Sequence, residues 1–396
     1  MAIRDSLRNT VCGLLFHSQL YRVIRLLRSI IQRREALIIL AYHKVNDHYK
    51  ERKYVRPHVR GLPVDEFRRQ MAYLKRRHNV LSLLSAAQMM QNGVKLPKNA
   101  VAITLDDGYL DNYLNAYPIL RSQKLPATFF LTTGFIGCRR PAWLLTLSAY
   151  LRLSPCKSLR LNSFDQCLRK LARAGRKFLS SSTTSLAEAS DEEVLRKMLK
   201  TVTPDMIEDL VEECAPEPEQ AYETLQLATL RDKAKARGIL GDRLQRRPLY
   251  ERELLLDILR VRLGLKGAIY VPFGEMLRWH EVREMEQAGM SFGAHTFSHA
   301  ILTQVSRELA QREISQSKRR IEVFLKKPVT LFCYPNGKRN DFDEEYVAYL
   351  RRVGFVASCC TIPGSNDSES DLFALRRIGP SGNLTVFAMK SSGILT

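Results

Sequence analysis

The sequence lacks the features that would place the protein across a membrane or in an oxidising compartment. It has no run of about eighteen apolar residues, so no transmembrane helix is expected. Its first residues show no long apolar core followed by a small-residue cleavage site, which argues against a secretory signal peptide. The eight cysteines are irregularly spaced and form no CxxC pair, so free thiols in a reducing compartment are the simpler interpretation. We therefore expect a cytoplasmic protein.

Acidic residues are scarce relative to basic ones. Lys and Arg number 62 and Asp and Glu 41, so the net charge is +21. A surplus of this size favours anionic partners, namely a membrane surface, an acidic glycan or nucleic acid. Nucleic acid is the least favoured of the three, because the basic residues are spread along the chain, only two tryptophans are present and no known binding motif appears.

Residues 1–35 form a basic and apolar segment that predicts an amphipathic N-terminal helix. Seven arginines and two acidic residues occur there. The apolar stripe of the predicted helix consists of Leu20, Ile24, Leu27 and Ile31. Such a helix suits peripheral contact with an anionic membrane, here at its inner face. A surface helix packed on the body of the protein is an equally good interpretation.

After residue 36 the pattern alternates short buried strands with helices. Strands are predicted at 36–43, 100–105, 127–132, 268–271, 290–294, 330–334 and 355–359. Helices are predicted at 64–76, 81–92, 113–123, 279–288, 306–325 and 344–353. These spacings are typical of parallel βα units and predict an α/β fold.

One long segment interrupts this alternation. Residues 138–267 carry helical periodicity and many charges but no clear buried strand. The Ser/Thr-rich stretch 180–190 and the Pro-broken stretch 215–219 resemble linkers inside it. We therefore expect residues 36–137 and 268–396 to form two parts of one βα sheet or barrel, split by a helical insertion at 138–267.

Two adjacent carboxylates, Asp106 and Asp107, directly follow the predicted strand at 100–105. Like charges at this spacing repel each other, and a bound cation removes that cost. Gly108 then lets the chain turn sharply. Because Asp-Asp-Gly is also common in ordinary turns, this pattern alone does not identify a site.

A histidine pair, His295 and His299, follows the predicted strand at 290–294. Imidazole nitrogen suits zinc-like metals. Most histidine pairs at this spacing are surface or core residues, but the chain has only eight histidines. Two histidines and one carboxylate leave coordination positions open for water and substrate, which is the arrangement of a catalytic metal site. Further along, the predicted strand at 330–334 runs into a Pro-Asn-Gly turn whose backbone N–H groups could face an oxyanion.

Together these segments resemble the conserved motifs of the NodB-type polysaccharide deacetylases, carbohydrate esterase family 4. Residues 106–108 resemble the first motif, residues 295–299 resemble the second, and residues 333–337 stand in the place of the third. Similarity to the subgroup that includes bacterial poly-N-acetylglucosamine deacetylases extends over 42–45, 127–130, 133–137, Trp279 and 375–378. The resemblance implies a deformed (β/α) barrel of the polysaccharide deacetylase type, with a metal at its C-terminal mouth and a large helical insertion.

The resemblance also implies roles for individual residues. Asp107, His295 and His299 match the metal ligands, with zinc the expected ion and cobalt, nickel or manganese the alternatives. Asp106 matches the general base. Asn336 matches the position whose backbone N–H helps the metal to stabilise the oxyanion.

The sequence departs from the family pattern at two places. The third motif usually begins with an arginine that orients the base, and Cys333 stands there, so Arg377 is the candidate replacement. No histidine follows His299, so the usual C-terminal general acid is absent. In the subgroup this histidine lies near the N-terminus, which makes His43 the candidate acid. The alternative is a strand-end histidine that only bonds the backbone.

The expected activity is metal-dependent hydrolysis of an N-acetyl group on an amino sugar, with release of acetate from a polysaccharide or a lipid-linked glycan. The charge surplus favours an anionic or lipid-linked carbohydrate. Two alternatives stay open. One is an N-deformylase of a lipid-linked sugar, and the other is a glycan-binding pseudo-enzyme, suggested by Cys333 in the arginine's place.

Overall fold

The computed structural model describes residues 36–47, 61–138, 143–180, 189–201, 223–267 and 275–395, together with residues 206 and 269. The predicted N-terminal helix and the stretch 215–219 lie outside these ranges, and only residue 269 of the predicted strand at 268–271 lies inside them. No helix in the described part of the chain is long and apolar enough to cross a membrane. The chain divides into two compact units: unit 1, residues 1–139 and 275–396, and unit 2, residues 140–274. The predicted boundaries after residues 137 and 267 lie near this division.

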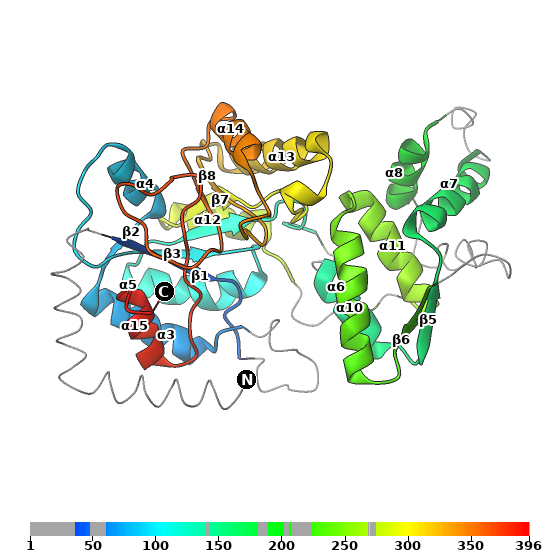
Figure 1. Ribbon diagram of the computed structural model, residues 1–396, viewed down its shortest axis with the longest axis horizontal. Helices are drawn as coiled ribbons and strands as arrows, with labels where there is room; N and C mark the ends of the chain where they lie inside the picture. Colours follow the sequence, from blue (N-terminus) through cyan, green and yellow to red (C-terminus); the bar gives the residue numbers. More distant parts are fainter. Residues whose placement is uncertain are drawn as a thin grey trace. The chain divides into compact units, whose positions relative to one another are not determined.

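Unit 1 is built on a parallel sheet with the strand order β1-β3-β4-β7-β8-β9, and β2 also pairs with β3. The sheet curls into a half-barrel with helices around it (Figure 1), which confirms the predicted deformed (β/α) barrel. The strands span Leu37–Tyr42 (β1), Asn79–Leu81 (β2), Ala100–Leu105 (β3), Thr128–Leu131 (β4), Ser291–Ala294 (β7), Leu331–Cys333 (β8) and Ala357–Cys359 (β9).

The helices of unit 1 lie between successive strands, except for the last helix, which follows β9. They span Val64–Arg77 (α3), Leu83–Gln91 (α4), Tyr117–Gln123 (α5), Trp279–Gln287 (α12), Arg307–Leu325 (α13), Glu344–Arg352 (α14) and Leu384–Ser391 (α15), and one π-helical turn, Asn112–Ala116 (η2), precedes α5. Several begin at a residue whose side chain accepts a backbone N–H bond, namely Ser82, Ser306, Asp343 and Asn383. Helices α3 and α15, far apart in the sequence, lie side by side (Figure 1).

Strand β1 shows why the predicted strands are continuous apolar runs. All six of its residues are buried. Ile38 and Leu40 belong to the large core between the sheet and the surrounding helices, whereas Leu37 and Ile39 belong to a second, inner core. Both faces of the sheet are therefore covered, as in other parallel sheets. Helix α4 also packs its apolar residues into the inner core.

A short segment after β9 joins the two edges of the curled sheet. Leu375 bridges to Cys359 of β9, and Ile378 bridges to Leu40 of β1. Backbone bonds support these bridges, among them Ile378 N to Ile39 O at 2.8 Å. Residues 375–378 thus lie between the first and last strands, and Arg377 is fixed at this seam.

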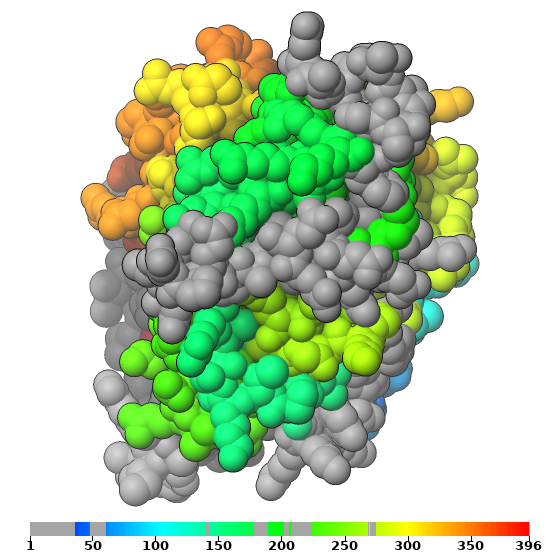
Figure 2. All heavy atoms as spheres, turned by 90° about the vertical axis from the view of Figure 1, so that its right-hand side faces the viewer, coloured from blue at the N-terminus to red at the C-terminus, as the bar shows by residue number. Residues whose placement is uncertain are grey.

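Unit 2 contains the helices α6 (Trp143–Leu153), α7 (Phe164–Ser180), α8 (Asp191–Thr201), α10 (Leu230–Gln245) and α11 (Leu249–Arg262). Its green and yellow-green helices form much of the surface in Figure 2. The sequence pattern shows no clear buried strand here, and the two strands that the structure adds are partly exposed: Ser158–Leu161 (β5) pairs antiparallel with Glu223–Gln226 (β6). Each strand has only four residues, and β5 alternates exposed and buried side chains, so neither forms an apolar run.

Candidate active site

Three strands of unit 1 end in polar side chains at one edge of the sheet. Asp106 and Asp107 follow β3, His295 follows β7, and Cys333 ends β8. Parallel strands direct their C-terminal ends to the same edge, so residues far apart in the sequence meet there. Within the described residues, two groups of possible metal ligands lie at this edge, and both include His295.

The first group consists of Asp107, His295 and His299, whose ligand atoms all lie within 4.8 Å of one another. Asp107 Oδ1 lies 3.5 Å from His295 Nε2 and 3.4 Å from His299 Nε2. Two ligands at about 2.0–2.2 Å from one ion lie about 3.3–3.6 Å apart at the tetrahedral angle, so both separations suit a single zinc-sized ion. The His299 side chain is 25% exposed, which leaves this group accessible to solvent.

The hydrogen bonds around His295 favour a cation in this group. Its Nδ1 lies 2.7 Å from the carbonyl oxygen of Cys333, and a carbonyl only accepts, so Nδ1 carries the proton. Burial lowers the pKa of His295, so the ring is neutral and Nε2 carries a lone pair. That lone pair faces Asp107 Oδ1, a buried oxygen with no hydrogen-bond partner among the described residues. A bound cation satisfies both acceptors.

Asp106 is held by Arg377 in a buried, bidentate ion pair. Arg377 donates from Nη1 to Oδ1 at 2.8 Å and from Nη2 to Oδ2 at 2.7 Å. It also donates to Cys360 O at 2.9 Å and to Thr104 Oγ1 at 3.1 Å. Burial by itself would raise the pKa of Asp106, but Arg377 outweighs it and holds the pKa well below its usual range. The carboxylate is therefore ionised, as a general base must be.

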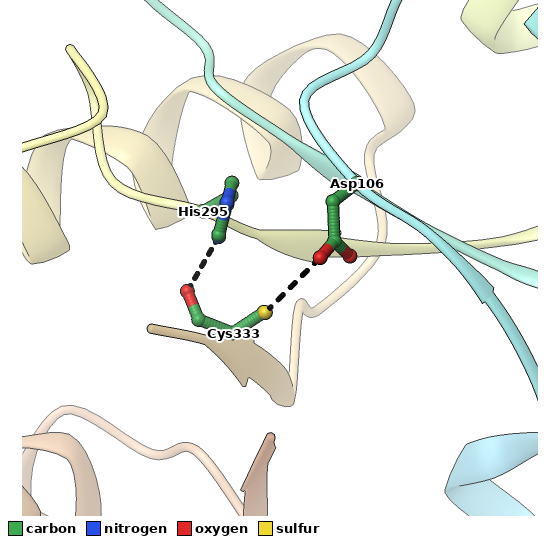
Figure 3. Close-up of side chains that lie close together, drawn as sticks. All are labelled: Asp106, His295 and Cys333. Atoms are coloured by element: carbon green, nitrogen blue, oxygen red, sulfur yellow. Dashed lines mark hydrogen bonds between the residues drawn. The ribbon is translucent and has the colours of Figure 1, made fainter. Parts of the chain in front are cut away.

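Cys333 lies close to both Asp106 and His295 (Figure 3). Its Sγ is 3.8 Å from Asp106 Oδ2, and its carbonyl accepts the His295 bond described above. Burial raises the pKa of the thiol well above its usual value, so Cys333 is a neutral, weak donor rather than a replacement for a guanidinium. Asp106, His295 and Cys333 do not form a separate metal site, because Arg377 already occupies the Asp106 carboxylate.

His43 follows β1 and faces the same edge of the sheet. Its Nε2 lies 3.8 Å from Asp106 Oδ2, and 54% of its side chain is exposed. Asn336 is exposed in the turn after β8. Its backbone N–H donates to no other described residue, whereas its carbonyl accepts from Thr361 Oγ1. His43 is accessible to a bound substrate, and the Asn336 N–H is available to an oxyanion.

Backbone strain is concentrated in the turns of this site. Asp107, Thr296, His299 and Asn336 have φ angles of 75°, 60°, 61° and 57°, and they are four of the seven non-glycine residues with positive φ in the described part of the chain. Such conformations cost about 1–3 kcal/mol each and cluster at functional sites. Thr296 is the most strained by type, because its side chain is β-branched.

Several residues that support the site are missed by the sequence analysis. Glu313 of α13 accepts from Ser298 N at 2.7 Å and from Ser298 Oγ at 2.8 Å, and so braces the turn between the two histidines. Lys44 is buried, with Nζ 4.2 Å from the centre of the Tyr109 ring. Nothing in the sequence points to Glu313. Closeness to the aspartate pair is the only signal for Tyr109.

Comparison with known proteins agrees with this geometry. The sequence profile of the polysaccharide deacetylases matches residues 93–213 and 253–358, more than half of the chain. The chain belongs to the polysaccharide deacetylase family. The profile spans β3 with Asp106 and Asp107, β7 with the two histidines, and β8.

Individual members of the polysaccharide deacetylase family match over shorter stretches. YxkH of Bacillus subtilis (strain 168), provisionally named a polysaccharide deacetylase, is 25% identical over 122 residues, 30% of this chain and 43% of YxkH. The poly-β-1,6-N-acetyl-D-glucosamine N-deacetylase of Staphylococcus aureus (strain MSSA476) is 38% identical over 72 residues, 18% of this chain and 25% of that enzyme. The matched segments thus span less than half of these relatives. The Streptococcus pyogenes deacetylase PplD, solved with acetate, has the same fold: the TM-score is 0.50 at 16% identity, covering 91% of this chain and 99% of PplD.

Proposed function

We propose that this protein is a metal-dependent N-deacetylase that hydrolyses the acetamide of an N-acetylated amino sugar in a glycan. The observation that carries the proposal is one ionised carboxylate, held by a buried arginine, beside a group of one carboxylate and two histidines at the same strand edge. The S. aureus relative, whose name specifies an N-acetylglucosamine polymer, supports an amino-sugar substrate.

Asp107, His295 and His299 are the proposed ligands of the cation. They would hold a divalent cation, which would supply a water of lowered pKa and polarisation of the acetamide carbonyl. Two imidazoles and one carboxylate suit zinc, with cobalt, nickel or manganese as alternatives. The Cys333 carbonyl fixes the ring orientation and tautomer of His295, so the protein orders this ligand before any metal binds.

The remaining residues supply the proton transfers. Asp106 takes the proton of the attacking water, and its bidentate contact with Arg377 fixes the carboxylate. The backbone N–H of Asn336 donates to the oxyanion. His43 gives a proton to the nitrogen as the C–N bond breaks, because an amine is too basic to leave as an anion. The products are acetate and a free amino sugar.

The pseudo-enzyme alternative was suggested by the missing arginine of the third motif. Arg377 supplies a guanidinium to Asp106 in its place, which argues against this alternative. Its guanidinium reaches the base from the seam of the barrel instead of from β8. The N-deformylase alternative differs only in the acyl group, so parallel assays with N-acetylated and N-formylated sugars distinguish the two.

Metal content by mass spectrometry tests the proposal first. We expect close to one divalent ion per chain in the wild type, and its loss in Asp107→Ala and His295→Ala. His280→Ala is the matched control, because the His280 side chain is 70% exposed and paired with Glu281 instead. The wild type should also release acetate from a β-1,6-linked N-acetylglucosamine pentamer. Equal metal in all four proteins, or no acetate from a metal-loaded wild type, would refute the proposal.

A further inference from the structure

Two side chains that follow the aspartate pair reach across to the loop that carries His43. Asp111 precedes the π-helical turn η2, and Asn112 is its first residue. Asn112 is fully buried. Its Nδ2 donates to the main-chain oxygen of His43 at 2.8 Å, across 69 positions of sequence. The turn that holds Asp106 and Asp107 is thus tied directly to the candidate general acid.

The Asp111 carboxylate interacts with the next three residues of the same loop, residues 44–46. It accepts from Asn46 Nδ2 at 2.7 Å and from Asn112 Nδ2 at 2.9 Å. The Val45 N–H and the Lys44 charge also interact with its carboxylate. The loop after β1 is therefore held at four consecutive positions by Asp111 and Asn112, beginning with His43.

This arrangement is poorly explained as a device for stability. Burial raises the pKa of Asp111 to about 6 even with Lys44 beside it, and burial lowers the pKa of Lys44. Both charges are thus less favourable in the folded protein than in water, and opposite charges in such surroundings are often no more stabilising than apolar side chains of the same size. What the contacts provide is a fixed separation between the loop of His43 and the turn of Asp106.

We propose that Asp111 and Asn112 are positioning residues that hold His43 where it can protonate the departing amine. The inference rests on the proposed deacetylase function. When the C–N bond breaks, its electron pair goes to the nitrogen, which takes the proton from His43. Main-chain displacement at His43 would carry the imidazole away from that nitrogen while leaving Asp106 with Arg377.

Two substrates separate this role from general damage to the fold. The N-acetylglucosamine pentamer has an amine leaving group that needs the proton of His43, whereas 4-nitrophenyl acetate has a leaving group that departs as an anion. A displacement of about 1 Å costs on the order of 100-fold in rate, so we expect Asn112→Ala to lower kcat for the amide ~10- to ~100-fold. The ester rate should stay within ~3-fold, because it does not depend on the acid.

A double-mutant cycle identifies the route of the effect. If Asn112 acts through His43, the change Asn112→Ala should alter amide turnover by less than ~3-fold when His43→Ala is already present. Asp111→Asn keeps the shape of the side chain and removes its charge. It should shift the two substrates in the same selective way, and it carries the test if Asn112→Ala does not fold.

Asn115→Ala is the matched control. Asn115 Nδ2 donates to the main-chain oxygen of Val45 at 2.8 Å, the same kind of bond to the same loop but two residues from His43. Its variant should leave the ratio of amide to ester rates unchanged. Equal losses on both substrates in Asn112→Ala, or an undiminished loss in the His43→Ala background, overturn the inference alone. A wild type that releases no acetate from the pentamer overturns the proposed function instead.

Discussion

Replacing Arg377 by methionine should strongly destabilise unit 1. Methionine keeps much of the length of the side chain but removes the charge and four hydrogen bonds, to Asp106, Thr104 and Cys360. Both charged side chains are at most 2% exposed, so water cannot replace the lost partner. Breaking a buried ion pair from one side costs about 3–5 kcal/mol, because it leaves an uncompensated charge. We expect a loss of that size in the free energy of unfolding.

The two tryptophans allow this loss to be measured in unit 1 alone. Trp143 belongs to α6 of unit 2 and Trp279 to α12 of unit 1, and the chain has no others. In a Trp143→Phe background, fluorescence during urea unfolding reports the surroundings of Trp279. A change below about 1 kcal/mol for Arg377→Met would show that the pair is not the buried, bidentate contact described here.

A compensating pair of substitutions tests whether the guanidinium or its strand is what matters. In Arg377→Cys/Cys333→Arg the cation reaches Asp106 from β8, whereas Cys333→Arg alone places a second cation next to Arg377 with no second carboxylate. Coupling between residues in contact is about 0.5–3 kcal/mol. The double variant should therefore be more stable than the sum of its two single changes predicts. If the stability change of the double variant equals the sum of the two single changes, positions 333 and 377 do not serve the same carboxylate.

Three further changes test the site from other directions. Gly108→Ala should cost more unfolding free energy than Gly289→Ala, since both need positive φ but only at position 108 would a Cβ meet two side chains within 2.9 Å; equal losses in urea unfolding would contradict this. The folded protein holds the Asp111 proton to a pKa of about 6 against about 3.9 unfolded, so the contribution of Asp111 to stability should fall by about 2 kcal/mol as pH rises from 4 to 7. Asp111→Asn should lose this pH dependence of the free energy of unfolding. An unchanged dependence in the variant would show that Asp111 is not its source. Cys333→Ala should keep acetate release within ~3-fold, because a neutral thiol at 3.8 Å contributes little; a loss of ~100-fold would show that the thiol acts in the reaction.

The barrel was predictable because its strands are buried on both faces. Strands β1, β3 and β4 consist entirely of buried residues, so each appears in the sequence as an apolar run. Strands β2, β5 and β6 have three or four residues with exposed positions among them. Their formation depends on pairing with segments distant in the sequence, which the local residue pattern does not predict.

The residues of the candidate site were predictable where they lie close together in the sequence. The two aspartates and the two histidines each come from a single segment, so residue type and spacing reveal them. The contacts of Asn112 with His43 and of Arg377 with Asp106 join residues 69 and 271 positions apart. Only the folding of the sheet brings these partners together. The resemblance pointed to Arg377, but nothing pointed to Asn112.

The seam of the barrel explains how cysteine is tolerated in the third motif. The buried Asp106 carboxylate requires one guanidinium, and electrostatics does not specify the strand that supplies it. Residues 375–378 close the sheet between β9 and β1, and the Arg377 side chain reaches Asp106, which follows β3, from this seam. With that requirement met, position 333 has to provide only a small buried side chain and a carbonyl for His295. The charge that the family motif usually supplies from β8 therefore comes to the same carboxylate from the seam, through Arg377.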